Sequence, residues 1–257
     1  MPKDISLKKG LTINLVGDAD KVYASLKPND RTTKYVVKPT DFHGLTPKLI
    51  VEIGDKVKAG SPLFFDKSNE KIIFCSPVSG EISDIIRGEK RRILEVVVKA
   101  NSEIVYESFA ISSANDLSRE QIIDGMLKAG VWPFIRQKPY DIIANPVDIP
   151  KAIFISAFKS APLTIDNDFA LYGMEELFQK GLNYIVKLTS GKTHLNIDGN
   201  TNGSKLFAQA KGVEVNTISG PHPAGNVGVQ IHHIEPINKG ETVWYLEPQD
   251  VLTIAKL

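Results

Sequence analysis

A single cysteine and the absence of any long apolar run set the first limits on this chain of 257 residues. Cys75 has no partner for an intrachain disulfide, and one thiolate cannot ligate an iron–sulfur cluster. This cysteine content suits a reducing compartment. No stretch approaches the roughly 18–20 apolar residues of a membrane-spanning helix, and no apolar core of a signal peptide follows residues 1–4. We therefore expect a chain that is not itself integral to a membrane.

An excess of charge of either sign is also missing. The 31 basic and 30 acidic residues leave a net charge of +1, which gives no reason to expect nucleic acid or a strongly anionic membrane as a partner. The local exception lies between two strand patterns and comprises Arg87, Lys90, Arg91 and Arg92. Two interpretations stay open for this cluster, a solvated loop and a contact with a phosphate or a partner protein.

The sequence lacks the usual nucleotide fingerprints. Neither G-x-G-x-x-G nor G-x-x-x-x-G-K-[ST] occurs, so the backbone cradle that these motifs make for a pyrophosphate is missing. The nearest segment, residues 199–204, is small and polar but has the wrong glycine spacing. We interpret it as an ordinary loop in which Ser204 or a neighbour caps a helix, in preference to an anion contact.

A metal-ligating pattern is missing as well. His222, His232 and His233 lie within a dozen residues, but no cysteine or carboxylate pattern completes a tetrahedral site around them. We therefore expect no metal.

Short strand patterns separated by tight turns fill residues 49–98. This order resembles the barrel-sandwich hybrid of biotinyl and lipoyl carriers, and we expect that fold here. In true carriers the modified lysine lies in an Asp-Lys-Ala or Met-Lys-Met triplet, and the hairpin at residues 66–71 has neither triplet. We therefore expect Lys67 and Lys71 to be solvated residues of a scaffold turn.

The pattern changes period after the sandwich. Ser118 and Gln121 form a capping box, apolar side chains recur at helical spacing over residues 122–127, and Gly130 supplies the stop, which together predict a short helix. The proline-rich residues that follow, up to residue 150, are typical of a connection between domains.

Strand and helix alternate in the rest of the chain. A buried strand is predicted at residues 152–157 and further strands at residues 194–197 and 213–218, with helices near residues 175–181 and 204–210. Residues 183–188 leave two interpretations open, a further strand and a longer helix, and the pattern at residues 251–255 is strand-like. This order favours βαβ units and a mainly parallel, Rossmann-like sheet.

The predicted fold class is therefore α/β plus all-β. We assign residues 1–109 to the barrel-sandwich hybrid, residues 110–150 to a helical and proline-rich connection, and residues 151–257 to the Rossmann-like domain without a dinucleotide fingerprint.

The densest motif is Gly-Pro-His-Pro-Ala-Gly at residues 220–225, followed by Gly228 and His232. Proline fixes its own φ and glycine lets backbones approach, so we expect a rigid loop at the end of a strand, where α/β sheets usually place their sites.

With this motif, the chain closely resembles the NqrA family, the A subunits of the bacterial sodium-translocating NADH:quinone reductases. Further matches to that family lie at residues 7–11, 87–94, 130–132, 151–154 and 248–251. One departure is that Val229 and Gln230 stand where the family commonly has Thr-His, so only His232 matches there. Family members also continue beyond residue 257, so we expect this sequence to be the N-terminal portion of such a protein.

The resemblance implies a membrane complex that oxidises NADH, reduces quinone and expels sodium ions, with its flavins and iron–sulfur centre in other subunits. The NqrA subunit is then a peripheral component at the cytoplasmic face of the bacterial inner membrane, without a redox cofactor of its own. It is associated with quinone binding and with docking on the membrane-embedded subunits. Nucleic acid is not an expected partner, and the chain is expected to meet the membrane only through its partner subunits.

The resemblance also supplies candidate site residues. Candidates for a quinone or partner contact are Gly220, Pro221, His222, Pro223, Ala224, Gly225, Gly228 and His232. We expect His222 to hold the loop by hydrogen bonding and the loop to serve in docking, while donation from His222 to a quinone oxygen is the alternative. No residue is a catalytic candidate.

Two other classes stay open. A component of the related Rnf-type electron-transport complexes would share the modules but should carry clustered cysteines, and this sequence has one. A stand-alone carrier-like domain would carry a lipoyl or biotinyl adduct on Lys67 or Lys71. The kind of quinone and the oligomeric state are not predicted.

Overall fold

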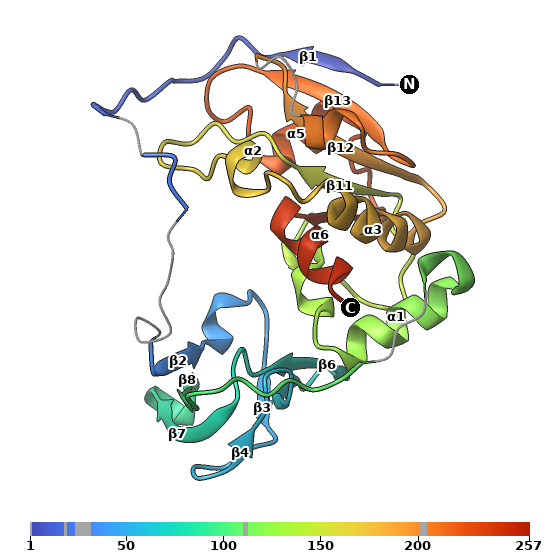
Figure 1. Ribbon diagram of the computed structural model, residues 1–257. Coiled ribbons are helices and arrows are strands. Elements are labelled where there is room, and N and C mark those ends of the chain that lie inside the picture. The colour runs from blue at the N-terminus through green and yellow to red at the C-terminus, as the bar shows by residue number, and fades with distance from the viewer. Residues whose placement is uncertain (1, 18–19, 24–31, 110–112, 201–204) are drawn as a thin grey trace. The chain divides into compact units, whose positions relative to one another are not determined.

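A computed structural model describes residues 2–17, 20–23, 32–109, 113–200 and 205–257. The contacts divide the chain into two units, which are described separately (Figure 1). The first contains residues 1–21, 112–122 and 134–256, and the second contains residues 22–111, 123–133 and residue 257.

The second unit contains two small antiparallel sheets. One has the order β2 (Lys34–Val37), β8 (Ile93–Ala100), β7 (Gly80–Arg87) and β4 (Lys56–Val57), and the other has the order β3 (Pro47–Leu49), β5 (Pro62–Asp66) and β6 (Asn69–Cys75). Single 3-10 turns, η2 (Pro39–Asp41) and η3 (Glu89–Arg91), lie in the connections. Fully buried side chains from both sheets form its core: Leu63, Phe64, Ile82, Val96, Val97 and Val98. The expected short strands of a barrel-sandwich hybrid are present.

The β5–β6 hairpin is closed by a local side-chain contact. The Asp66 carboxylate accepts a hydrogen bond from the backbone N–H of Ser68 at 3.0 Å, and Asp66 pairs with Asn69 across the turn. Lys67 and Lys71 are both exposed on this hairpin.

The predicted helix is α1 (Arg119–Lys128), and its capping box is confirmed. The backbone N–H of Ser118 donates to Oε1 of Gln121 at 2.8 Å, and the N–H of Gln121 donates back to Oγ of Ser118 at 3.3 Å. Gly130 ends the helix with φ of +69°, and a Cβ there would collide with Sγ of Cys75. Burial raises the pKa of that thiol to about 12, as expected for a cysteine that packs as a small apolar group.

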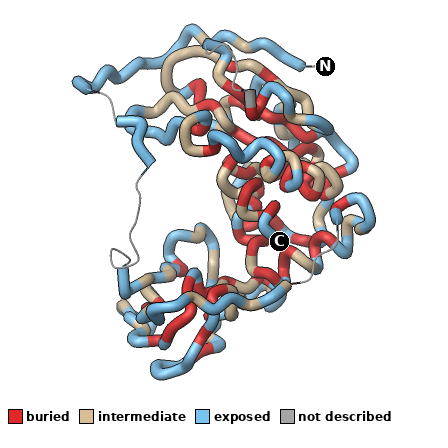
Figure 2. The backbone as a smooth tube through the Cα atoms, viewed as in Figure 1, coloured by how far each residue is buried: buried red, intermediate tan, exposed pale blue. Residues whose placement is uncertain are grey.

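The first unit is built on a seven-stranded sheet. Its order is β1 (Asp4–Ser6), β13 (Glu214–Ser219), β12 (Lys192–Asp198), β11 (Ala152–Ser156), β14 (Val243–Leu246), β9 (Arg136–Lys138) and β10 (Ile142–Ile143). The first five strands are parallel to one another. β9 pairs antiparallel with β14 on one side and with β10 on the other. All five residues of β11 are fully buried, which confirms the buried strand predicted at residues 152–157 (Figure 2).

Short helices connect the parallel strands. They are α2 (Asn167–Ala170), α3 (Glu175–Ile185) with η6 (Val186–Leu188), α4 (Lys205–Ala208) and α5 (Val227–Ile234). A further helix, α6 (Pro248–Ala255), follows the last strand, while η4 (Ala114–Asp116) lies before α1 and η5 (Trp132–Phe134) follows it. Ile231 and Ile234 of α5 pack in one core cluster with Ala152 and Phe154 of β11. Since side chains alternate along a strand, Ile153 of β11 faces the opposite side of the sheet.

The strand order fixes where a site can form. The chain builds β11, β12 and β13 outward in one direction and then returns to place β14 on the other side of β11. This order matches the 3-2-1-4 portion of a doubly wound sheet, with its switch point between β11 and β14. The predicted Rossmann-like topology is therefore confirmed.

Two predicted strand patterns are helical in the structure. Residues 183–188 continue α3 and η6, so the longer helix is the correct alternative; Phe178, Leu182 and Ile185 fall on one buried face of it. Residues 251–255 belong to α6, and their strand-like interpretation is wrong. The side chain of Glu247 and that of Asp250 form a capping box around Pro248 at the start of that helix, which overrides the β-branched residues that follow.

The domain limits differ from the predicted ones at two places. β1 pairs in parallel with β13, Asp4 opposite Thr217, so these residues belong to the α/β sheet and not to a sandwich over residues 1–109. β9 and β10 join the same sheet, although residues 110–150 were expected to be a connection. Both additions rest on pairing between segments far apart in sequence, which local patterns do not reveal.

A network of buried polar side chains lies between the sheet and α5. The side-chain amide of Asn196 donates to Oε1 of Gln230 at 2.9 Å, and that of Asn216 donates to Oδ1 of Asn196 at 2.9 Å. Nε2 of His194 lies 3.1 Å from a carboxylate oxygen of Glu235, yet burial dominates and lowers the pKa of His194. Asn196 and Asn216 are fully buried, so water cannot replace a hydrogen bond that either side chain loses.

We expect Asn196→Ala to lower the free energy of unfolding by about 1–3 kcal/mol, because it leaves the buried Oε1 of Gln230 without its donor and removes one acceptor of the Asn216 amide. Urea unfolding can be followed through buried Trp244 in a Trp132→Phe background, so that only the α/β unit reports. Asn196→Ala combined with Gln230→Ala should cost less than the sum of the single changes; full additivity would contradict the network.

Candidate functional site

Two cavities open at the carboxyl ends of the parallel strands, and they share the side chains of Lys159 and Thr164. The switch-point cavity, about 550 Å³, lies where the loops after β11, β13 and β14 meet. Its lining residues are Lys138, Lys159, Ser160, Ala161, Thr164, Gly225, Asn226, Val227, Gly228, Val229, Tyr245 and Glu247. This is the position at which open α/β sheets bind ligands.

The predicted loop at residues 220–226 forms one wall of the switch-point cavity. Gly225 and Gly228, both sequence candidates, line it. The backbone N–H of Gly225 donates to Oγ of Ser160 at 2.7 Å, and a Cβ on Gly225 would collide with the backbone N of Ser160. The glycine is therefore required for the close approach of two chain segments, as its place in the motif suggested.

His222 holds this loop from outside the cavity. Its Nδ1 lies 3.3 Å from Oγ of Ser160, and its carbonyl accepts a hydrogen bond from the N–H of Leu11 at 2.9 Å. These two contacts are of the kind expected for a histidine that holds the loop by hydrogen bonding. His222 is not among the residues that line the cavity.

The other candidates of the motif divide into buried and peripheral positions. Ala224 is fully buried in the core under α5, and Gly220, with φ of +138°, passes against the backbone of Leu7. Pro221 and Pro223 flank His222 in the loop, and Pro223 is exposed. His232 lies exposed on the last turn of α5, beside His233, and is not brought to the cavity.

Charged side chains at the cavity were missed by sequence reasoning. Nζ of Lys159 lies 2.6 Å from a carboxylate oxygen of Glu247, and Nζ of Lys138 lies 3.3 Å from Asp141. The hydroxyl of Tyr245 donates to Asp141 at 3.2 Å, and burial raises the pKa of Tyr245 to about 12. The sequence does contain a signal for these residues. Lys159 and Glu247 each lie just after a buried parallel strand, where charged residues are often part of a site.

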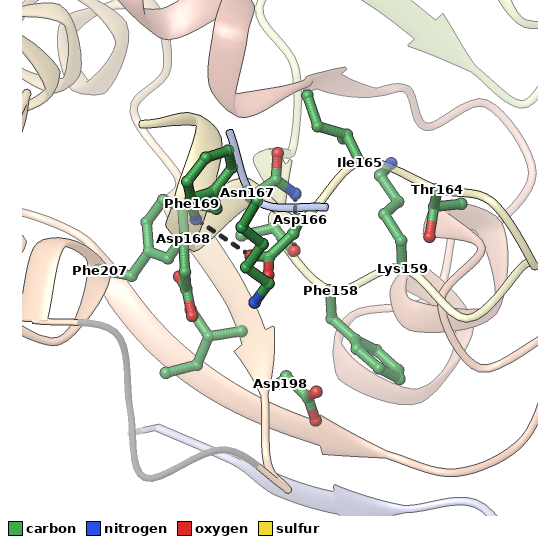
Figure 3. Close-up of a pocket in the computed structure, with 13 residues that line it drawn as sticks. Phe158, Lys159, Thr164, Ile165, Asp166, Asn167, Asp168, Phe169, Asp198 and Phe207 are labelled. Atoms are coloured by element: carbon green, nitrogen blue, oxygen red, sulfur yellow. Dashed lines mark hydrogen bonds and ion pairs between the residues drawn. The ribbon is translucent and has the colours of Figure 1, made fainter. Parts of the chain in front are cut away.

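The second cavity, about 510 Å³, lies between the loops after β11 and β12. Figure 3 shows Asp166, Asn167 and Phe169 near α2, and Asp198 at the end of β12. Nζ of Lys21 lies 2.5 Å from a carboxylate oxygen of Asp166, and this contact holds the pKa of Asp166 below its usual range. Residues 201–204, the latter part of the small polar segment considered for an anion contact, lie outside the described residues.

The basic cluster belongs to the other unit. Its four members, Arg87, Lys90, Arg91 and Arg92, are exposed at the β7–β8 connection. Across the ranges that the structure describes, no group of three or more His, Cys, Asp or Glu side chains is arranged to hold a metal ion. Within the same ranges, no helix has the length and apolar character needed to cross a bilayer.

Comparison with protein families gives two matches, which follow each other along the chain as the sandwich and the α/β fold were predicted to do. Residues 5–101 match the NqrA N-terminal barrel-sandwich hybrid domain, and residues 117–257 match the NqrA second alpha/beta domain. The chain belongs to the NqrA family. The resemblance drawn from the Gly-Pro-His-Pro-Ala-Gly motif is thereby confirmed, and so is the predicted pair of folds.

Curated relatives of this NqrA chain are named as the A component of the Na(+)-translocating NADH-quinone reductase. The protein of Yersinia pseudotuberculosis serotype O:1b is 36% identical over 256 residues, covering 98% of this chain and 56% of the relative. Those of Neisseria meningitidis and Pseudomonas aeruginosa are 34% and 32% identical over the same shares. The chain therefore spans about half the length of the curated relatives that it matches.

We expect Gly225→Ala to lower the free energy of unfolding by about 1–3 kcal/mol. The added methyl group would force the backbone of the loop at residues 220–226 away from the backbone of Lys159 and Ser160. Gly228→Ala is the matched control, since a Cβ there meets no atom within 4 Å. It should leave stability unchanged or raise it by up to about 1 kcal/mol, because Gly228 lies in α5 and alanine favours a helix over glycine. Equal urea midpoints for both variants would contradict a close approach at Gly225.

Asp250 should make stability depend on pH. Burial raises its pKa to about 6, with the charge of Glu247 adding to the effect, so the folded protein holds a proton that the unfolded chain releases. Its contribution is greatest below the ordinary aspartate pKa of 3.8 and is lost as pH rises through 6. Asp250→Asn keeps an oxygen for the N–H of Glu247 and should add roughly 1–2 kcal/mol at pH 7. A pH series of unfolding midpoints checks this; no gain at pH 7 contradicts it.

Proposed function

We propose that this chain acts as the peripheral NqrA component of a Na(+)-translocating NADH:quinone reductase, a complex that couples NADH oxidation and quinone reduction to sodium export. The observation that carries the proposal is that both domains match those of NqrA in the same order. The chain is also 36% identical, over 98% of its length, to a curated NqrA protein. In this role it lies at the cytoplasmic face of the bacterial inner membrane.

Within that complex, we propose that the chain holds neither flavin nor an iron–sulfur centre and that other subunits carry them. Cys75 is its one cysteine, and neither nucleotide fingerprint occurs in the sequence. The α/β unit then serves as a scaffold, and the isolated chain is expected not to oxidise NADH. The single cysteine also argues against a component of an Rnf-type complex.

Docking on the membrane-embedded subunits is the role that we propose for the loop at residues 220–226 and the start of α5. The loop is fixed by Ser160 and His222, so little conformational entropy is lost when a partner binds it. Quinone contact at this loop stays a prediction of the family resemblance. The cavity beside it is lined by Lys138, Lys159 and Glu247, and such charged walls favour a polar partner over a quinone ring.

The test is a pull-down with the tagged chain on detergent-solubilised membranes of a bacterium that carries the reductase. Recovery of the membrane-embedded reductase subunits, identified by mass spectrometry, is the expected result. Gly228→Trp should lower this recovery at least several-fold, because the indole blocks the exposed start of α5. Lys180→Trp, on the exposed side of α3, is the matched control and should leave recovery unchanged.

Two results would count against the proposal. If the chain recovers none of the reductase subunits, docking through these residues is wrong. If Gly228→Trp and Lys180→Trp recover the subunits equally well, the chain docks through another surface.

A further inference from the structure

The connection between β7 and β8 concentrates positive charge. Arg87, Lys90, Arg91 and Arg92 are all exposed there, and Glu89 is the one acidic residue among positions 87–92. None of the four basic side chains makes an ion pair with an acidic residue of the described ranges. Their charge is therefore not neutralised within the described part of the unit.

The backbone of this connection is held in an unfavourable conformation. Lys90 has φ of 52° and ψ of 31°, and Arg91 has φ of 60°, so two consecutive side-chain-bearing residues adopt the left-handed region. Tight hairpin turns with that geometry favour asparagine and glycine. Residues in sparsely populated backbone conformations cluster at functional sites, so this turn is a place to look for one.

Local hydrogen bonds fix the turn. The N–H of Gly88 donates to the carbonyl of Arg92 at 2.8 Å, and the N–H of Arg92 donates to the carbonyl of Glu89 at 3.1 Å. The guanidinium of Arg87 donates to the carbonyl of Arg91 at 3.3 Å. The basic side chains are thus presented from a defined hairpin end, which we call the basic tip (residues 87–92).

The chemistry of the basic tip favours a flat anionic surface. Protein interfaces centre on buried aromatic and apolar anchors, and positions 87–92 hold none. The apolar residues beside it offer little, since Ile93 is buried and Ile86 is 36% exposed. Clusters of four or more basic residues bind anionic lipid headgroups, and arginine pairs with phosphate through two parallel hydrogen bonds.

We propose that the basic tip binds the anionic phospholipid headgroups of a membrane surface. It would give the chain a direct electrostatic contact with the bilayer. The proposal rests on this hairpin alone and does not need the docking role described above, because lipid vesicles without any protein suffice to test it.

The experiment is co-sedimentation of the whole chain with phosphatidylcholine vesicles, with and without roughly 30% phosphatidylglycerol, at about 50 mM and about 500 mM salt. We expect binding only to the vesicles that contain phosphatidylglycerol, and loss of it at the higher salt. Each cation should contribute roughly fivefold to binding. The variant R87Q/K90Q/R91Q/R92Q should therefore bind at least about a hundredfold more weakly, with an unchanged unfolding midpoint.

Two control variants distinguish binding by the basic tip from binding through the overall charge of the unit. K56Q/K67Q/K71Q/K99Q removes the same number of exposed cations from the same unit and should change binding less than twofold. R87K/R91K/R92K keeps the charge and should keep most of the binding.

Three results would overturn the proposal. One is equal binding by the two glutamine variants, and another is equal binding to vesicles with and without phosphatidylglycerol. The third is tip-dependent binding to polyglutamate with no vesicle binding, which would identify an acidic protein as the partner.

Discussion

The site region of the α/β unit depends on one close approach, between the backbone of Gly225 and that of Lys159 and Ser160. These segments follow different strands, β13 and β11, and they meet because Gly225 has no side chain. The approach lets Oγ of Ser160 accept the N–H of Gly225 and lie beside His222. It thereby fixes the loop, and the loop fixes where α5 begins. The switch-point cavity is a consequence of this packing.

The same contact explains why a Rossmann-like sheet here differs from a dinucleotide site. In a dinucleotide-binding fold the glycines lie in the turn after the first strand, so that a pyrophosphate can approach the backbone. Here the turn after β11 carries Phe158 and Lys159, and the critical glycine lies across the sheet in the loop after β13. The close approach is made by the protein's own chain. Fold similarity alone would have suggested a dinucleotide site, although the sequence contains neither nucleotide fingerprint.

Sequence patterns predicted the elements that are determined locally. The capping box of α1, the stop at Gly130 and the apolar run of β11 each depend on residues close in sequence, and the structure confirms them. The pattern at residues 251–255 is strand-like because of its β-branched residues, whereas the capping box of Glu247 and Asp250 around Pro248 starts a helix there. The place of β1 could not be predicted, since three residues say nothing about a partner more than 200 positions away. Likewise the motif predicted Gly225, whereas Lys159 and Glu247 became neighbours only through the order of the strands.

The pairing of β1 with β13 also makes the sandwich an insertion within the other domain. The α/β sheet takes its first strand from residues 4–6 and the rest from residues beyond 134, so residues 32–109 lie inside its sequence. During synthesis the strand at residues 4–6 must wait until residues 217–219 of its partner have been made. Such long-range pairing is slow, because a large loop must close before the contact is made. The strands of the sandwich, which end at residue 100, have all been synthesised before β13 begins at residue 214.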